Sequence, residues 1–184
     1  MASNAVNLGV GYASGYFYHG PKNTELPASP LTSPGTGWTE VGYVAQDGIT
    51  WHNGRTATPL KDWANKIRRL LQEDSTGTVE VPIISTTAEV LKTIFGSANV
   101  TASAASTTHG ALTSVDVEEG VMSGEEAFLF IMKDGDDALM LGTTCGVITD
   151  VADVNFAPGS AITWTATISA DKWTFMKDDG QVTT

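Results

Sequence analysis

Residues 38–96 decide the fold, and they read WTEVGYVAQDGITW (38–51), HNG (52–54), RTATPLKDWANKIRRLLQED (55–74) and STGTVEVPIISTTAEVLKTIFG (75–96). The clearest strand signal lies in residues 78–83. There Val79, Val81 and Ile83 alternate with Thr, Glu and Pro, and this period of two is typical of a strand with one buried face. Upstream, Trp38–Trp51 predicts two short strands about an Asp-Gly turn.

The segment from residue 62 to residue 77 permits two interpretations. Asp62 is a plausible helix N-cap, and apolar residues follow it at helical spacing, so local propensity predicts a helix. The turn-forming residues 74–77 (DSTG) instead favour a hairpin. In that case residues 67–73 form one strand and residues 78–83 its partner.

Residues 86–95 carry the strongest helix signal. Thr86 and Glu89 have the spacing of a capping box, and Gly96 stands where a C-terminal glycine belongs. Four apolar residues make one stripe, which predicts that the helix packs on a sheet: Val90, Leu91, Ile94 and Phe95.

The rest of the chain predicts more strands, interrupted by loops. Residues 1–37 divide into a strand at 6–10 and a proline-rich extended arm, which is either mobile or ordered against a neighbouring subunit. Residues 97–114 are small and polar, with the character of strand or loop. Further strands are predicted at 115–118, 125–132, 138–141, 144–151 and 161–170. Many short strands with one helix indicate a mainly β fold, a β-sandwich or barrel, over residues 38–184.

Charge is unevenly distributed along the 184 residues, whose formal net charge is −11. Segment 55–69 holds five basic residues and one acid and is therefore about +4, so the remainder is −11 − 4 = −15. An acidic surface repels the phosphate backbone, and ordinary nucleic-acid binding is disfavoured. A conduit through which DNA must slide without sticking needs such a surface.

Features of secretion, membrane insertion and disulfide bonding are missing from the sequence. The start has no positively charged n-region, and the longest apolar run, residues 127–132, is far too short to span a bilayer. Cys145 is the single cysteine, so no intrachain disulfide forms, which suits synthesis in a cytosol. We expect Cys145 to be a small buried apolar residue.

Motifs of known catalytic or metal sites are also missing, and we expect no catalytic, cofactor-binding or metal-binding residues. The acid pairs at 118–119 and 125–126 resemble the carboxylates of glycoside hydrolases, but adjacent acids are common in a chain with 21 acidic residues. Residues 133–137 lack the ligand pattern of a calcium loop and predict a hairpin turn. His19, His52 and His109 each lack a neighbouring His or Cys.

Residues 38–96 also resemble a known family. A Trp followed by a Gly-Tyr pair, an Asp-Gly turn, a charged segment ending in a basic hairpin, and a short helix closed by Phe-Gly resemble the major tail tube proteins of long-tailed (siphovirus-type) bacteriophages. The resemblance implies a structural protein, not an enzyme. Its fold would be a β-sandwich with a short flanking helix, whose inner sheet completes a shared β-barrel in a hexameric ring. It also implies that residues 67–84 are a hairpin, which decides the ambiguous segment in favour of strands.

By the same resemblance, residues 51–66 correspond to a loop that contacts the neighbouring ring, and the hairpin lines the bore. We therefore expect inter-ring or inter-subunit contacts from Trp51, Arg55, Lys61, Trp63, Lys66, Arg68 and Arg69. We expect lumen-lining positions at Glu73, Asp74 and Glu80.

The resemblance further implies that hexamers stack into a helical tube in the phage tail of the virion, after synthesis in the host cytoplasm. Partners would be a tape measure protein inside the tube and tail terminator and distal tail proteins at its ends. Double-stranded DNA would pass without specific binding, and the chain would not insert into a membrane.

Two alternatives remain open. An acidic β-sandwich can be a carbohydrate-binding module, with Trp38, Trp51 and Trp63 stacking on sugars. The tube subunit of a contractile injection apparatus shares the fold implied by the resemblance.

Overall fold

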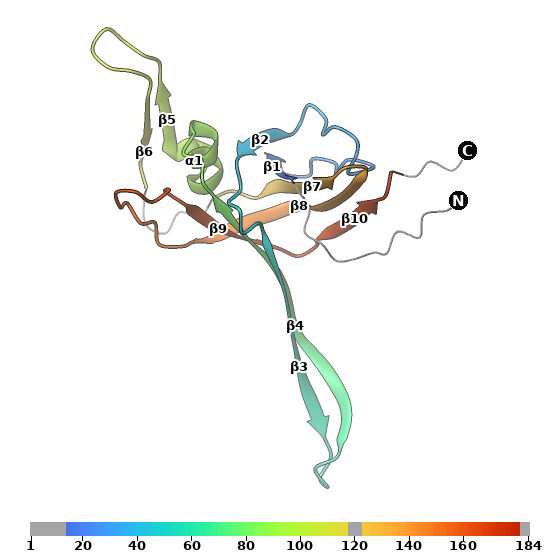
Figure 1. Ribbon diagram of the computed structural model, residues 1–184. Coiled ribbons are helices and arrows are strands. Elements are labelled where there is room, and N and C mark those ends of the chain that lie inside the picture. The colour runs from blue at the N-terminus through green and yellow to red at the C-terminus, as the bar shows by residue number, and fades with distance from the viewer. Residues whose placement is uncertain (1–13, 118–122, 181–184) are drawn as a thin grey trace.

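The computed structural model describes residues 14–117 and 123–180, with all their side chains except those of residues 14, 55–56 and 72–76 (Figure 1). The strands are β1 (Ser14–Pro21), β2 (Thr39–Gly42), β3 (Thr50–Lys61), β4 (Ile67–Ile83), β5 (Val100–Ser103), β6 (Leu112–Val115), β7 (Glu126–Asp134), β8 (Asp137–Val151), β9 (Trp164–Ala170) and β10 (Thr174–Asp178). They are joined by helix α1 (Ala88–Phe95) and the short 3-10 helix η1 (Ser97–Asn99). The described chain is therefore mainly β with one α-helix, which confirms the predicted class.

Two antiparallel sheets share the long strand β8. The strand order is β2-β1-β7-β8-β9-β4-β3, and β10 also pairs with β8. The edge of β8 that faces away from β7 pairs with β10 through residues 138–142 and with β9 through residues 147–151. β8 thus passes from one sheet into the other. The sheet order ends at β2 and at β3, so the sheets do not close into a barrel.

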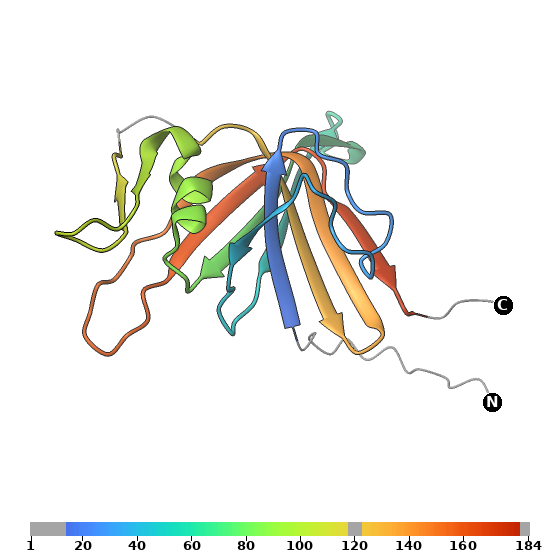
Figure 2. The same cartoon turned by 90° about the horizontal axis from the view of Figure 1, so that it is seen from above.

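The main core lies between the two sheets and beneath α1. Phe17 of β1 stacks on Phe130 of β7, with ring centroids 4.7 Å apart, and both are buried. Val79 of β4 and Ile168 of β9 face them from the second sheet and are fully buried. Each such side chain stabilises the fold by about 1.5–3 kcal/mol. Seen from above, β1, β7 and β8 run side by side, and α1 lies beside β2 (Figure 2).

A second apolar cluster lies on the other face of β7 and β8. Leu129 and Met140 are buried there beneath Leu26 and Trp38 from the segment between β1 and β2. The Trp38 indole Nε1–H also donates to the carbonyl of Glu25 over 3.2 Å. Through Leu26 and Trp38 this segment packs on the sheet of its own chain. The predicted strand at residues 6–10 lies outside the described residues.

The prediction of strand for residues 67–73 is confirmed, but the predicted turn at 74–77 is wrong. β4 runs unbroken from Ile67 to Ile83 and pairs with β3 along its length. Its hairpin partner is therefore the segment predicted as the loop 51–66. Residues 74–77 have turn chemistry, but their backbones pair with β3, with Asp74 opposite Thr56.

The actual turn spans residues 62–66. Asn65 adopts a left-handed conformation with φ of 60°, which asparagine tolerates better than most residues. The Asp62 backbone N–H donates to the Lys66 carbonyl over 2.9 Å, and the Lys66 N–H donates to the Asp62 carboxylate over 2.8 Å. These two bonds close the hairpin.

Three smaller expectations are also corrected. The N-cap of α1 is Thr87, not Thr86, and its hydroxyl accepts from the Val90 N–H over 3.3 Å. The two strands around the Asp-Gly turn exist, but β2 pairs with β1 and β3 pairs with β4. The strands predicted at 138–141 and 144–151 are one strand, β8, and residues 100–115 form the separate β5–β6 hairpin.

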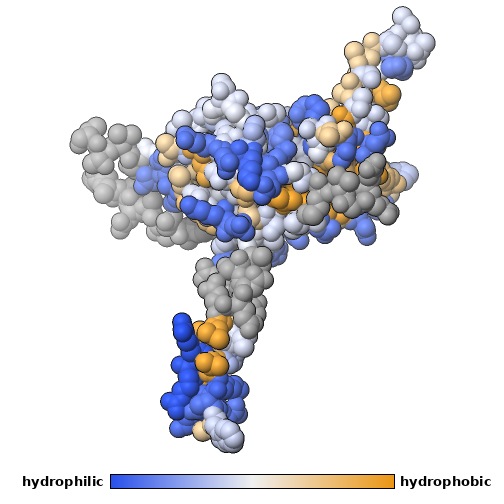
Figure 3. Space-filling model, turned by 180° about the vertical axis from the view of Figure 1, so that it is seen from behind, coloured by the Kyte–Doolittle hydropathy of each residue, from blue (hydrophilic) through white to orange (hydrophobic). Residues whose placement is uncertain are grey.

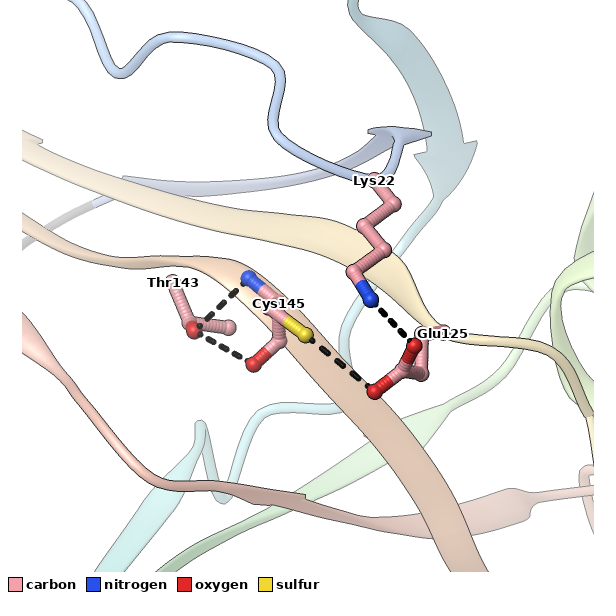
Figure 4. A network of polar contacts seen from close by, with 4 residues as sticks. All are labelled: Lys22, Glu125, Thr143 and Cys145. Carbon is pink, nitrogen blue, oxygen red and sulfur yellow. Dashed lines mark hydrogen bonds and ion pairs between the residues drawn. The ribbon is translucent and has the colours of Figure 1, made fainter.

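A polar network surrounds Cys145 of β8, where the pairing of β7 and β8 shifts register (Figure 4). The Thr143 hydroxyl donates to the Cys145 carbonyl over 3.1 Å and accepts from the Cys145 N–H over 3.3 Å. The Cys145 thiol donates to Glu125 over 3.5 Å, and the other Glu125 oxygen pairs with Lys22 over 2.5 Å. The hydrogen bond from Lys22 lowers the pKa of Glu125. The pKa of Cys145 is raised, mainly by burial and then by the neighbouring Glu125 carboxylate. Cys145 is thus half-buried and hydrogen-bonded, not simply a buried apolar residue.

Gly77 marks the point where β3 and β4 leave the body, and we predict that it does not tolerate a side chain. A Cβ there would lie 2.6 Å from Cδ1 of Trp173, whose indole Nε1–H donates to the Gly77 carbonyl over 2.9 Å. Gly77→Ala should lower the free energy of unfolding by about 1–3 kcal/mol, measured by urea denaturation of the unassembled chain. Gly110→Ala is the control, because no atom lies within 4 Å of its Cβ position. Equal stability of the two variants would contradict the prediction.

Candidate functional site

The first candidate surface is the projecting hairpin, defined as residues 54–76. β4 pairs with β9 only from Gly77 to Ile83, so residues 67–76 pair with β3 alone. Figure 1 shows this part of β3 and β4 extending well away from the sandwich. A two-stranded ribbon is at best marginally stable in water, and both its edges offer unpaired backbone groups. The projecting hairpin therefore has the properties of an element that is completed by a partner.

Large apolar side chains are exposed along this hairpin. Trp63 at the turn is fully exposed, and Leu70 and Ile67 are 64% and 60% exposed. Leu60 and Leu71 are also exposed. Figure 3 shows apolar and strongly polar residues mixed at the distal end. Apolar side chains gathered on one element of a soluble protein indicate an interaction surface.

Positive charge gathers at the same distal end. Lys61, Lys66 and Arg69 are exposed and make no ion pair with any residue whose side chain is described. Arg68 is different, because its guanidinium pairs with the Asp62 carboxylate over 2.5 Å and is thereby neutralised. The distal end therefore presents three cations that have no ion-pair partner among the described side chains, beside exposed apolar side chains.

Only part of the predicted contact set lies at this distal end, namely Lys61, Trp63, Lys66, Arg68 and Arg69. Trp51 lies at the base of β3 instead, opposite Val79, and its ring packs edge-on against Phe175 with centroids 4.7 Å apart. Arg55 lies in β3 opposite Ser75, and its side chain is not among those described.

The second candidate surface is the polar face, the side of β9, β4 and β3 that points away from the core. Because side chains alternate along a strand, Glu80 lies on this face while its neighbours Val79 and Val81 are buried. Glu80 is opposite Thr50 on β3 and Thr167 on β9, and Asp150 of β8 is also opposite Thr167. The His52 ring Nε2 lies 3.6 Å from the Glu80 carboxylate. The face is therefore rich in hydroxyls and carries exposed acids.

Of the three predicted lumen residues, Glu80 alone has a described side chain. Glu73 and Asp74 lie within the projecting hairpin, and their side chains are outside those described. Asp150, Thr165 and Thr167 were not among the residues predicted for this face. The alternation of threonines in residues 161–170 showed that they share a face, but only the register with β4 shows that this face includes Glu80.

The described part of the chain has no metal-binding cluster, no membrane-spanning helix and no platform shared by the three tryptophans. No three or more His, Cys, Asp or Glu side chains cluster there in a way that could hold a metal ion. Among residues 14–117 and 123–180, no helix has the length and hydropathy needed to cross a bilayer. The three tryptophans considered for sugar stacking do not share a platform, because Trp38 covers the second apolar cluster, Trp51 lies at the hairpin base and Trp63 at its turn.

One comparison with known proteins identifies a family. A family model described as phage tail tube protein matches residues 1–179. No curated protein matches the chain in sequence. Among solved structures, a chain of the extracellular contractile injection system PVC sheath-tube complex in its extended state has a TM-score of 0.53, at 8% identity over 96% of this chain and 99% of that chain. At this identity the likeness is one of fold.

Two further solved chains are similar over most of their length. One comes from the PVC sheath/tube terminator in its extended state, with a TM-score of 0.46 at 8% identity over 94% of this chain and 99% of that chain. The other comes from the anti-feeding prophage tube terminating cap, with a TM-score of 0.44 at 11% identity over 96% and 99%.

Acid should loosen the turn of the projecting hairpin. The hydrogen bond from the Lys66 backbone N–H, and then the bond from Arg68, lower the pKa of Asp62. A carboxylate whose pKa is lowered by folding stabilises the fold above its unfolded pKa of about 4, and this contribution is lost as the pH falls through the folded value. In NMR, the Lys66 amide resonance should therefore titrate with a midpoint below the ordinary aspartate pKa. Asp62→Asn should abolish that titration, and a midpoint at or above the ordinary aspartate value would contradict the assignment.

Proposed function

The chain belongs to the phage tail tube proteins, components of the tail of the virion, and on this premise we propose that it is the subunit that repeats along the tube. Copies join into hexameric rings, the rings stack into a helical tube, and the DNA genome passes through the bore during ejection. The observation that carries this proposal is the projecting hairpin, a long ribbon with open edges and exposed apolar side chains.

The open sheet supports the proposed ring. Within the described strands, β3 is the last of its sheet, and its outer edge is free to pair. A barrel with an aqueous channel needs roughly 16 strands or more, and one chain of this size cannot enclose a duplex. A ring that pools strands from several copies meets that requirement and removes the open edges.

The polar face is the surface proposed to line the bore. Glu80 and Asp150 supply negative charge that repels phosphates, and the hydroxyls of Thr165 and Thr167 present a wet, uncharged surface between them. Glu73 and Asp74 extend this set along the hairpin. Such a lining lets DNA pass without holding it at specific bases.

Stacking is proposed to depend on the distal end of the projecting hairpin. Lys61, Lys66 and Arg69 face an acidic surface of the next ring, and Trp63 is buried against it. Trp51 and Arg55 make contacts nearer the hairpin base, and Arg68 acts mainly through its pair with Asp62. Opposite charges fix register and polarity, and a contact that joins two different surfaces extends without closing.

Other tail proteins complete the proposed assembly. A tape measure protein occupies the tube before DNA enters, and terminator and distal tail proteins cover its two ends. We assign the chain to a long, non-contractile tail on its sequence resemblance. A sheath protein in the same particle would instead assign it to a contractile tail.

The first test is assembly of the purified chain. Negative-stain microscopy should show rings and tubes, and Lys66→Glu should raise the concentration needed for tube formation about tenfold, because it places like charges in contact. Lys172→Glu is the control, since it makes the same charge change at an exposed site near the hairpin base and away from its distal end. A wild-type chain that stays strictly monomeric at high concentration would overturn the proposed function.

A second test addresses the bore. Tubes of Glu80→Lys assembled with short duplex DNA should retain the DNA on sedimentation, and the retention should fall steeply with salt. Wild-type tubes should leave the DNA in the supernatant. Asp136→Lys, on the exposed turn between β7 and β8, is the charge-matched control. Equal retention by both variants would show that Glu80 does not line the bore.

A further inference from the structure

The β5–β6 arm, residues 100–115, stands apart from both sheets. β5 and β6 pair only with each other among the described strands, with Val100 opposite Val115 at the root and Ser103 opposite Leu112 nearer the end. Val100 is buried and Val115 half-buried, whereas every residue from 101 to 114 is exposed. Figure 1 shows the arm extending from the body on the side opposite to the projecting hairpin.

Helix α1 fixes the root of the arm. The Asp116 backbone N–H donates to the Asn99 carbonyl over 2.9 Å, and the Asn99 side-chain amide donates to the Phe95 carbonyl over 2.8 Å. The arm therefore leaves the body in a direction set by the helix. Beyond the root it is a second two-stranded ribbon with two open edges, and such a ribbon gains little stability by itself.

The arm is also free of formal charge. Between Lys92 and Asp116 the sequence contains no Asp, Glu, Lys or Arg, although the chain carries a net charge of −11. Copies of an acidic protein repel one another, so they touch most favourably where charge is absent or of opposite sign. The arm meets the first condition, and the distal end of the projecting hairpin meets the second.

We propose that the β5–β6 arm is a second contact between stacked copies of this chain, docking on the projecting hairpin of a copy in the neighbouring ring. This inference rests on the proposed function, because it requires head-to-tail stacking. In such a stack the arm side of one copy faces the hairpin side of the next. The exposed Leu112 of the arm meets the exposed Leu70 of the hairpin, and the open strand edges allow main-chain pairing between the two ribbons.

The test compares assembly of full-length variants. Leu112→Glu puts a charge on the neutral arm at a side chain that is 55% exposed, so the unassembled chain should unfold at the wild-type temperature. Tube formation, followed by light scattering and sedimentation, should require about a tenfold higher protein concentration. Leu31→Glu is the matched control, an exposed leucine on the loop between β1 and β2, and it should assemble as the wild type does.

Disulfide crosslinking tests which surface the arm meets. In a Cys145→Ser background, Ser103→Cys on the arm and Thr58→Cys on the hairpin are assembled together and oxidised. Mixed tubes should yield a crosslinked dimer that contains one chain of each variant. Normal assembly of Leu112→Glu, or the absence of that mixed dimer from mixed tubes, overturns this inference while leaving the tube function intact. A wild-type chain that forms no tubes overturns the proposed function and this inference together.

Discussion

The pairing of β4 is the constraint on which the rest of the structure depends. From Gly77 to Ile83 it pairs on both edges, with β3 and β9, and alternate side chains enter the core. From Ile67 to residue 76 it pairs with β3 alone and has no core to enter. The C-terminal half of β4 thus belongs to the sandwich, and its N-terminal half belongs to a two-stranded ribbon that has no packed face. The rigid half fixes where the ribbon leaves the body, and the ribbon carries the exposed apolar and basic groups.

The sequence is sufficient to predict that residues 78–83 form a half-buried strand, but not which strands pair with β4. Strict alternation in residues 78–83 predicts a half-buried strand, and the core confirms it. The turn at 74–77 was misplaced because Asp, Ser and Gly favour turns locally, and pairing with β3 overrides that preference here. The real turn at 62–66 depends on the left-handed Asn65 and the bonds of Asp62. Local propensity could not reveal it, because the alternative was a helix capped by the same Asp62.

The candidate surfaces were predictable in composition and only partly in position. The basic character of segment 55–69 is visible in the sequence, and the hairpin brings most of those cations to one distal end. The pair between Arg68 and Asp62, which removes one cation from that set, follows from the turn geometry. The polar face needed register information, because Asp150, Thr167 and Glu80 come from three strands far apart in the chain. Pairing between distant strands is the part of a β fold that local patterns specify least.

The placement of the two ribbons bears on how copies of this chain can assemble. A subunit with one binding surface forms at most a closed pair, whereas complementary surfaces on opposite sides extend indefinitely. The projecting hairpin and the β5–β6 arm lie on opposite sides of the sandwich (Figure 1), one basic and apolar, the other uncharged. Neither resembles the acidic remainder of the surface, so repulsion between acidic outer surfaces opposes contact between separate tubes while these ribbons permit stacking. In the proposed tube, charge therefore favours growth along the stacking direction, and main-chain pairing at the open strand edges stabilises the stacked copies.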